Sequence, residues 1–517
     1  MMQRQTLRRP ALVQKHRAVA QSLPAPVGGW NARDSLADMA PDDAVSLVNL
    51  YPGTTSVVLR DGFSKFATGL GAQVETVMSY EGAGTAKLFG IAGGNVYNCT
   101  AGGAVGAAEL SGLTNSRWQY VNISTAGGNF IEMCNGVDAV YTYDGSTWTD
   151  QSGNITGVTS SSLIGINLHK NRVWFVESGA LRAWYLPVQS ISGAAAALDL
   201  RSFCVHGGVL QAIGTWTIDA GYGVDDLWVG VTSEGEVLVY RGTDPSSAST
   251  WALVGIWHIG SPVGRRCMVK YAGDLLIICQ DGVFSMASAL QSSRTNPRVA
   301  LTDKIQSAMS SAVTSYGANY GWQLMPFPKH NALLLNVPVT AGNSQQQYVM
   351  NTITKAWCAF RGWNANVFEL YNDDLYFGGN TYVGKAWNTA EDDSGSIFID
   401  GLQAFNYFGS RGQQKRFTML RPILAINSTQ QINAGINVNF DQSAPTSAIG
   451  TASFSGALWD TGTWDSATWS SANSISQSWQ GATGVGYCGA PHIQANLDGA
   501  SLQWLATDVV MEAGGIV

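Results

Sequence analysis

Charged residues are scarce in this chain of 517 residues. Asp, Glu, Lys and Arg make up 13% of it, against about 25% in an ordinary soluble domain. Because hydrophobic residues make up 45% and there are 18 tryptophans, the chain has enough apolar surface to bury a large core. That composition excludes disorder as its main state. We expect a chain with so little charge to cover much of its surface with partners, since charged residues are depleted at interface cores.

Long apolar runs and paired cysteines are also missing. No stretch approaches the ~20 apolar residues of a membrane-spanning helix, and residues 1–26 lack the apolar segment of a secretory signal. The seven cysteines lie far apart and form no CxxC pair. An odd number at such spacing argues against a disulfide framework and against a zinc site. It predicts reduced thiols, made in a cytoplasm and mostly buried as small apolar residues.

Enzyme motifs are absent from the sequence. There is no HExxH, no GxSxG, no P-loop and no GxGxxG between a strand and a helix. The six histidines are isolated from one another in sequence, and the acidic doublets at 42–43, 225–226, 373–374 and 392–393 fall at turns or at a helix start. We therefore predict that the protein is not an enzyme and that it has no catalytic, cofactor-binding or metal-binding residues.

The few charges are unevenly placed along the chain. Residues 1–33 carry six Lys and Arg and no Asp or Glu. Subtracting these six positive charges from the net charge of −7 leaves −13 for residues 34–517. Such an acidic body is a poor candidate for tight nucleic-acid binding, because affinity for phosphate comes largely from Lys and Arg. The basic arm, residues 1–27, could touch DNA, but docking onto an acidic neighbour is the favoured use.

What the sequence does contain, between residues 56 and 400, is a repeated unit of short strands. An apolar strand, a polar turn and a second strand with an aromatic residue recur; the copies carry Trp118, Trp148, Trp184, Trp251, Phe284, Trp357 and Trp387. Most intervals between them lie at 30–36 residues, and that between Trp184 and Trp251 is 67, about twice 33. This period indicates small sheets repeated around an axis, a β-propeller of about six to eight compact blades. The alternative is a β-sandwich with tryptophans placed by chance.

Two short helices are predicted outside the repeat. Residues 41–51 place Ala44, Leu47, Val48 and Tyr51 on one helical face after Pro41, which makes 28–55 a helix-containing docking segment. Residues 301–313, LTDKIQSAMSSAV, predict an amphipathic helix inserted between blades, with Thr302 as its N-cap.

The last part of the chain, residues 401–517, predicts a C-terminal β-rich domain that closes on the propeller or packs beside it. Residues 405–428 and 432–441 look like two or three longer strands, and 502–517 alternate like a closing strand. Between them stand Trp459, Trp464, Trp469 and Trp479. These tryptophans could stack on sugars, but packing on the propeller or on a neighbouring subunit is favoured, since buried aromatics dominate interface energetics.

One short motif supports the propeller without indicating catalysis. Residues 142–148, TYDGSTW, match the Asp-box hairpin of sialidase-like propellers, in which Asp144 caps the turn and Trp148 packs between strands. A sialidase would also need a Phe/Tyr-Arg-Ile-Pro segment, and this sequence has none.

Several scattered segments resemble one family. The opening GGWNARDSLADMAPDDAVSLVNLYP (28–52) and LRDGF (59–63) carry the resemblance at the N-terminal end. LTDKI (301–305), KRFTMLRP (415–422), the WDTGTWDSATW repeat (459–469) and the terminal EAGGIV carry it further along. Together they are similar to the tail nozzle proteins (packaged-DNA stabilisation, tail tubular protein B-like) of short-tailed bacteriophages.

This resemblance implies a virion structural protein of the phage tail, assembled in the host cytoplasm. It implies a β-propeller chain, six copies of which form a ring below the portal and adaptor, with a central channel for genome retention and ejection. The partners would be itself as a homohexamer, the tail adaptor, tail fibres or tailspikes, and double-stranded DNA passing non-specifically. Two rivals remain: a carbohydrate-binding or host-attachment propeller, and a propeller glycoside hydrolase, which would need clustered acids and arginines at the central face.

Overall fold

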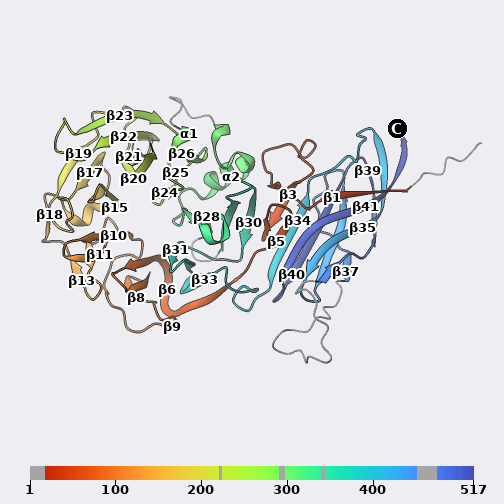
Figure 1. Ribbon diagram of the computed structural model, residues 1–517, viewed down its shortest axis with the longest axis horizontal. Helices are drawn as coiled ribbons and strands as arrows, with labels where there is room; N and C mark the ends of the chain where they lie inside the picture. Colours follow the sequence, from red (N-terminus) through yellow and green to blue (C-terminus); the bar gives the residue numbers. More distant parts are fainter. Residues whose placement is uncertain (1–17, 220–223, 290–296, 341–343, 451–473, 517) are drawn as a thin grey trace, which may run out of the picture.

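A ring of small sheets is joined to a sandwich of two larger sheets in the computed structural model of the protein (Figure 1). The structure describes residues 18–219, 224–289, 297–340, 344–450 and 474–516. The fold is all-β, a β-propeller with short inserted helices and a C-terminal β-rich region, which confirms the predicted fold class. No helix in these ranges is long and apolar enough to span a membrane.

Seven blades surround the axis in the part of the chain that the structure describes, within the predicted range of six to eight. The first is the C-terminal half of β6 (Phe63–Glu81) with β7 (Ala86–Ala92) and β8 (Asn95–Asn98). The second comprises β10 (Gln119–Thr125), β11 (Gly128–Cys134), β12 (Tyr141–Tyr143) and β13 (Trp148–Asp150). The third comprises β15 (Leu163–His169), β16 (Arg172–Glu177), β17 (Arg182–Tyr185) and β19 (Ala196–Asp199).

The remaining blades follow in chain order. The fourth comprises β20 (Leu210–Asp219), β21 (Val224–Thr232), β22 (Glu236–Gly242) and β23 (Trp251–His258). The fifth comprises β24 (Met268–Tyr271), β25 (Asp274–Cys279) and β26 (Gly282–Ser285). The sixth comprises β27 (Gln323–Phe327), β28 (Ala332–Thr340), β29 (Ser344–Asn351) and β30 (Trp357–Arg361). The seventh comprises β31 (Val367–Tyr371), β32 (Asp374–Gly378) and β33 (Asn380–Ala386) with the N-terminal half of β6.

Short elements join the blades at their edges. They are β9 (Gly103–Ala104), which pairs with β6, the pair β14 (Ile155–Thr156) and β18 (Gly193–Ala194), the helix α1 (Met286–Ala289), and single 3-10 turns at Ser160–Ser162, Pro297–Val299 and Pro328–His330.

The long strand β6 closes the ring. Its residues 63–73 pair with β33 as the outer strand of the seventh blade, and residues 74–81 pair with β7 as the inner strand of the first. Where the strand passes from one blade to the other, the register against β33 shifts by several residues. Gly69 and Gly71 have φ of +86° and +75° there, a conformation that other residues adopt only with strain.

Apolar clusters lie between neighbouring blades, as expected of small sheets that cannot bury a face alone. One cluster joins the seventh and first blades, another the first and second, and further clusters join the second to the third and the third to the fourth. The fourth, fifth and sixth blades share one large cluster. The core of the propeller is therefore a chain of interfaces between blades rather than a single centre.

The repeated aromatic residues lie at these interfaces. Trp148, Trp184, Trp251, Phe284, Trp357 and Trp387 each occur in the third or fourth strand of a different blade, or directly after it. The ring of Trp251 stacks on Trp174 of the preceding blade, with centroids 5.6 Å apart. Trp118 differs, because it precedes the inner strand β10 and is fully buried between the first two blades. The repeat thus marks one blade per period.

The Asp-box hairpin has the expected geometry. Asp144 Oδ1 accepts hydrogen bonds from the backbone N–H groups of Ser146 (2.8 Å) and Thr147 (2.7 Å). These bonds and those of the two hydroxyl groups lower the pKa of Asp144 to about 2. Trp148 packs on Tyr143 of its own blade and on Phe89 of the first blade, with centroids 4.8 and 5.4 Å away. The motif is a structural contact between two blades.

Removing that contact should destabilise the whole ring. We expect Trp148→Ala to lower the free energy of unfolding by about 3 kcal/mol, because a large ring is lost between two blades. Thermal unfolding of the isolated chain and of any assembly should both show the loss. Thr149→Ala, at an exposed position of the same strand β13, is the control and should change little. An unchanged melting temperature with loss of sugar binding would instead favour the carbohydrate-binding alternative.

The helix predicted near residue 300 is present. A 3-10 turn (Asp303–Ile305) leads into α2 (Gln306–Tyr316), which follows the fifth blade and packs on β26 and β28 with Met309, Ala312 and Val313 buried. Thr302 is the N-cap residue of the 3-10 turn, as the sequence predicts, but its side chain makes no capping hydrogen bond. Its hydroxyl accepts the backbone N–H of Val283 (3.1 Å), so this side chain anchors the segment to the fifth blade.

Two facing sheets form the C-terminal region. The first contains β38 (Ser474–Ser476), β35 (Gln413–Ile426), β41 (Leu502–Ile516), β5 (Val57–Leu59) and β4 (Leu50–Pro52), with β39 (Gln480–Gly486) on β35 and β1 (Ala18–Pro24) on β41. The second extends the sixth blade from β30 through β3 (Asp43–Val48), β34 (Ile397–Gln403), β40 (Gly489–Leu497), β36 (Gln431–Val438) and β37 (Ala448–Gly450), with β2 (Gly29–Trp30) on β3. The long strands expected in 401–517 are therefore present.

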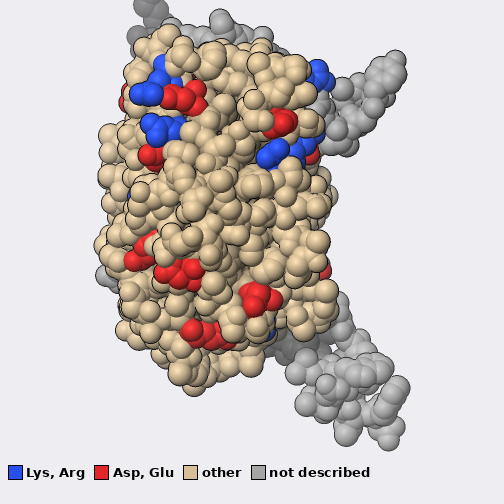
Figure 2. Space-filling model, turned by 90° about the vertical axis from the view of Figure 1, so that its left-hand side faces the viewer, with Lys and Arg blue, Asp and Glu red and all other residues tan. Residues whose placement is uncertain are grey.

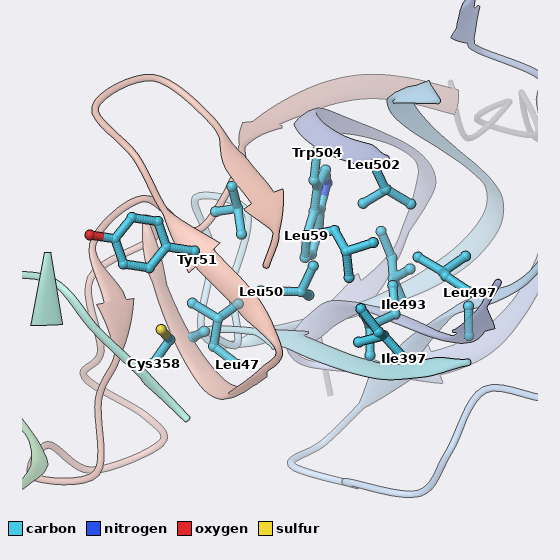
Figure 3. Close-up of a cluster of buried hydrophobic side chains, with 14 of the residues drawn as sticks. Leu47, Leu50, Tyr51, Leu59, Cys358, Ile397, Ile493, Leu497, Leu502 and Trp504 are labelled. Carbon is cyan, nitrogen blue, oxygen red and sulfur yellow. The ribbon is translucent and has the colours of Figure 1, made fainter. Parts of the chain in front are cut away.

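Apolar side chains from both sheets fill the space between them (Figure 3). Leu47 and Leu50 come from the N-terminal segment, and Ile493 and Trp504 come from the C-terminal strands. The same cluster continues into the sixth and seventh blades through residues such as Phe360. Propeller and sandwich therefore share one core, and residues 18–24 of the basic arm belong to the sandwich as β1.

The prediction of a helix over residues 41–51 is wrong. These residues form β3 and β4, separated by Asn49 with φ of +56°. Strand β3 lies between β30 and β34 in the middle of the second sheet, so its backbone groups bond on both sides. Tertiary pairing here overrides a weak helical pattern, as it does when a segment is buried on both faces.

Arg60 holds the junction of the two regions together. Its side chain is fully buried, and its guanidinium binds both carboxylate oxygens of Asp392 at 2.6 and 2.9 Å. It also donates to Asn49 Oδ1 (2.9 Å), and its Cζ lies 5.0 Å from the ring centroid of Trp363. Because these contacts satisfy the charge, the ion pair is stable despite its burial.

Candidate functional site: the propeller channel

A cavity of about 300 Å³ lies on the axis of the propeller. It is lined by residues of the innermost strand of every blade, namely β6, β10, β15, β20, β24, β27 and β31. These strands bond to one another across the blade boundaries: the side-chain amide of Gln323 on β27, for example, bonds both backbone groups of Phe368 on β31 at 2.9 Å. The channel is therefore built from a rigid ring of strands.

A carboxyl group stands in this channel. Burial raises the pKa of Glu369 to about 7, although a hydrogen bond from the Tyr120 hydroxyl and the charge of Arg266 both act to lower it. The backbone N–H of Leu370 donates to Glu369 Oε1 (3.1 Å). The Tyr120 oxygen in turn accepts the backbone N–H of Ser79 (3.1 Å) on the first blade. Three blades thus meet at one titratable group.

Arginines lie at one mouth of the channel. Arg266 Nη2 donates to the backbone oxygen of Trp118 (2.9 Å) and to Thr76 Oγ1 (3.2 Å). Arg117 pairs with Glu75 at 2.9 Å. Burial lowers the pKa of Arg265, and the neighbouring positive charge of Arg117 acts in the same direction. Sequence reasoning missed this group; its one signal is that Arg265 and Arg266 are the only Arg-Arg pair in residues 34–517.

Other polar clusters are built for structure. Ser46, Asp400 and His492 lie on three neighbouring strands of the second sheet, but the serine hydroxyl donates to Asp400 and not to the histidine. His492 Nδ1 faces the backbone oxygen of Ser443 at 3.1 Å. A catalytic triad needs its base against the nucleophile, so this group is no hydrolase centre. His206 and His258, far apart in sequence, do contact each other edge to face, with ring centroids 4.9 Å apart.

Metal sites and disulfides are not found in the described ranges. No three His, Cys, Asp or Glu side chains gather there in a way that could hold a metal ion. All seven cysteines are free and six are buried, which confirms their expected role as small apolar residues. Burial raises the pKa of the partly exposed Cys204 thiol to about 11, so it is protonated at neutral pH.

The C-terminal tryptophans fall mostly outside the described residues. Trp459, Trp464 and Trp469 lie in 451–473, which the structure does not describe. Trp479 is partly exposed, and the guanidinium of Arg421 lies 4.7 Å from its ring centroid. Trp479 therefore packs on Arg421 within the sandwich.

Comparison with known proteins finds only distant likenesses. No protein-family model matches the chain, and no curated protein does. Similar solved structures include BBS1N in complex with ARL6DN (11% identity, TM-score 0.40), covering 64% of this chain and 99% of that one. An exo-β-1,3-galactanase from Phanerochaete chrysosporium (11%, 0.29) covers 75% and 95%. Chaetomium thermophilum Raptor (10%, 0.39) covers 64% and 29%. At such values the likenesses carry no argument about activity or partners.

The titration of Glu369 should make stability depend on pH. Its pKa in the folded protein lies above the ordinary value of 4.5, so folding favours the protonated form. The stability that this form contributes is fully present below about pH 4.5 and falls as pH rises towards 7. Glu369→Gln should therefore raise the melting temperature relative to wild type at pH 8, with little difference at pH 4.5.

Tyr120→Phe is the companion variant. Because the lost hydrogen bond favours the charged carboxylate, its removal should move the fall in stability to higher pH. Glu391→Gln, which alters a carboxyl group that does not line the axial cavity, is the control. Identical pH profiles of Glu369→Gln and wild type would contradict the assignment.

Proposed function

We propose that this protein is a structural subunit of a short-tailed phage virion, a tail nozzle whose copies form a ring-shaped conduit for DNA. The observation that carries the proposal is the surface of the propeller rim. Figure 2 views the molecule from the side of the second, third and fourth blades, and its few charged groups are separated by wide uncharged areas. A surface so poor in charge suits burial against other subunits.

Exposed apolar side chains on this side of the propeller support the same proposal. Strand β23 is the outer strand of the fourth blade, and its alternate residues Val254 and Ile256 are 52% and 40% exposed. Val205, in the neighbouring loop, is 84% exposed. An edge strand with apolar residues is a site for contact with another chain.

The chemistry of the channel argues against the glycoside hydrolase alternative. Arginines are present at the central face, but Glu369 is the only acidic residue among those that line the axial cavity in the described part. Hydrolysis of a glycosidic bond ordinarily needs two carboxyl groups flanking the substrate. This supports a protein whose role is mechanical.

Electron microscopy of the purified protein, alone and with its adaptor, tests the assembly. We expect sixfold rings with a lumen about as wide as duplex DNA, as the resemblance to tail nozzle proteins implies. The double variant Val254→Glu, Ile256→Glu should abolish the rings and leave the monomer folded. Thr149→Glu, an exposed change on the second blade, is the control. A protein that stays monomeric and never joins a tail particle would refute the proposal.

The assembled ring should have little affinity for duplex DNA. The chain carries a net charge of −7, so a hexamer would carry roughly −42, which repels phosphate. Binding measured by fluorescence anisotropy should be weak and nearly independent of salt. Tight binding with a steep salt dependence would indicate a basic lumen instead.

A further inference from the structure

Three cavities meet at the mouth of the propeller channel. The axial cavity of about 300 Å³ adjoins one of about 350 Å³ beside the segment 317–322 and one of about 530 Å³ beside the first blade. Arg265 lines all three, Arg266 lines the first two, and Arg117 lines the second and third. The arginines therefore stand where the cavities join.

Positive charge exceeds negative charge around these cavities. Besides the three arginines, Lys270 lines the channel, whereas the only acidic residues in the described linings are Glu75 and Glu369. The charge of Glu75 is balanced by its ion pair with Arg117. Residues 34–517 as a whole carry a charge of −13, so the local surplus of positive charge is opposite in sign to the net charge of this part of the chain.

Two of the guanidinium groups have unused donors. Arg266 Nη1 is buried and has no hydrogen-bond partner in the described structure. Arg265 is exposed at the channel mouth, and no residue in the described ranges gives it a hydrogen bond or an ion pair. A buried N–H of a charged group is costly to leave unpaired, so an oxygen from outside the chain is expected at this point.

The surroundings hold the arginines in place. The ring of Tyr320 has Arg117 Cζ at 4.7 Å and Arg266 Cζ at 5.5 Å from its centroid, and its hydroxyl donates to the Glu75 backbone oxygen (3.1 Å). Before Arg265 the chain turns at Gly264, with φ of +74°; a Cβ there would lie 2.9 Å from the Cβ of Trp322. Such preorganisation favours binding of a small ligand.

We propose that the channel mouth is a binding site for a small oxyanion, a carboxylate or phosphate group held between Arg265 and Arg266. A planar guanidinium offers paired donors that match both groups. The cavities, of a few hundred Å³ each, have the size of small-molecule sites. The site lies within one propeller and does not depend on the tail function proposed above.

Isothermal titration calorimetry on the full chain, at physiological salt, tests the site with inorganic phosphate and, separately, with citrate. We expect saturable binding at one site, weakened at least about tenfold by Arg265→Gln because the paired donors are lost. Arg265→Lys should restore only part of the affinity, since an ammonium group cannot bind two oxygens in the same way.

Arg201→Gln is the matched control, because Arg201 is an exposed arginine of the third blade that pairs with Asp199. It should leave binding unchanged. Melting temperatures of all variants establish that they are folded, and added ligand should raise the melting temperature of wild type but not of Arg265→Gln. Binding of phosphate alone or of citrate alone supports the site and identifies the source of the oxyanion. Absence of saturable binding at millimolar concentration, or equal weakening in Arg201→Gln, would overturn it.

Discussion

Closure of the ring through β6 is the constraint on which the rest of the structure depends. A propeller is stable only when its last blade is joined to its first, because each blade covers its apolar face with the next. Here the single strand β6 joins the last blade to the first, because it pairs with β33 over residues 63–73 and with β7 over residues 74–81. The closure also positions the chain before β6. Arg60, three residues before that strand, binds Asp392 in the segment that follows β33. The sandwich is thereby attached at the point of closure, and its second sheet continues the sixth blade without a break.

The sequence predicted the parts of this fold that are local. A blade is formed by consecutive strands, so its aromatic residue recurs with the period of the blade: Trp148, Trp251 and Trp357 mark the second, fourth and sixth blades. The Asp-box turn and helix α2 are local as well, since each is specified by neighbouring residues. Pairing between strands that are distant in sequence has no such local pattern. Nothing in residues 18–24 indicates that they add to β41 near the other end of the chain, and nothing around Phe63 indicates a strand shared by two blades.

The wrong prediction of a helix over residues 41–51 also arises from pairing between distant parts of the chain. Ala44, Leu47 and Val48 are all buried, which a helical face would also explain. A strand inside a sheet covered on both faces loses the alternation that identifies it, because its two faces are both apolar. Only the pairing of Val48 with Ala359 and of Leu47 with Gly401 decides between the two readings, and that information lies more than three hundred residues away.

The channel could not be predicted for a related reason. Its residues come from seven strands, each of which supplies no more than a few, so no segment contains enough of them to form a motif. Tyr120 and Glu369 meet only because the ring closes. Composition was also misleading here. An acidic chain depleted in charge gives no sign of a basic site, yet three of its arginines meet at the channel mouth while the rim shown in Figure 2 is mostly uncharged. Charge in this protein is therefore partitioned by location. The charge-poor rim fits the proposed contacts between subunits, where buried charge is unfavourable. At the channel mouth Arg117 pairs with Glu75 and Arg266 Nη2 donates to Trp118, which leaves Arg266 Nη1 for the proposed oxyanion.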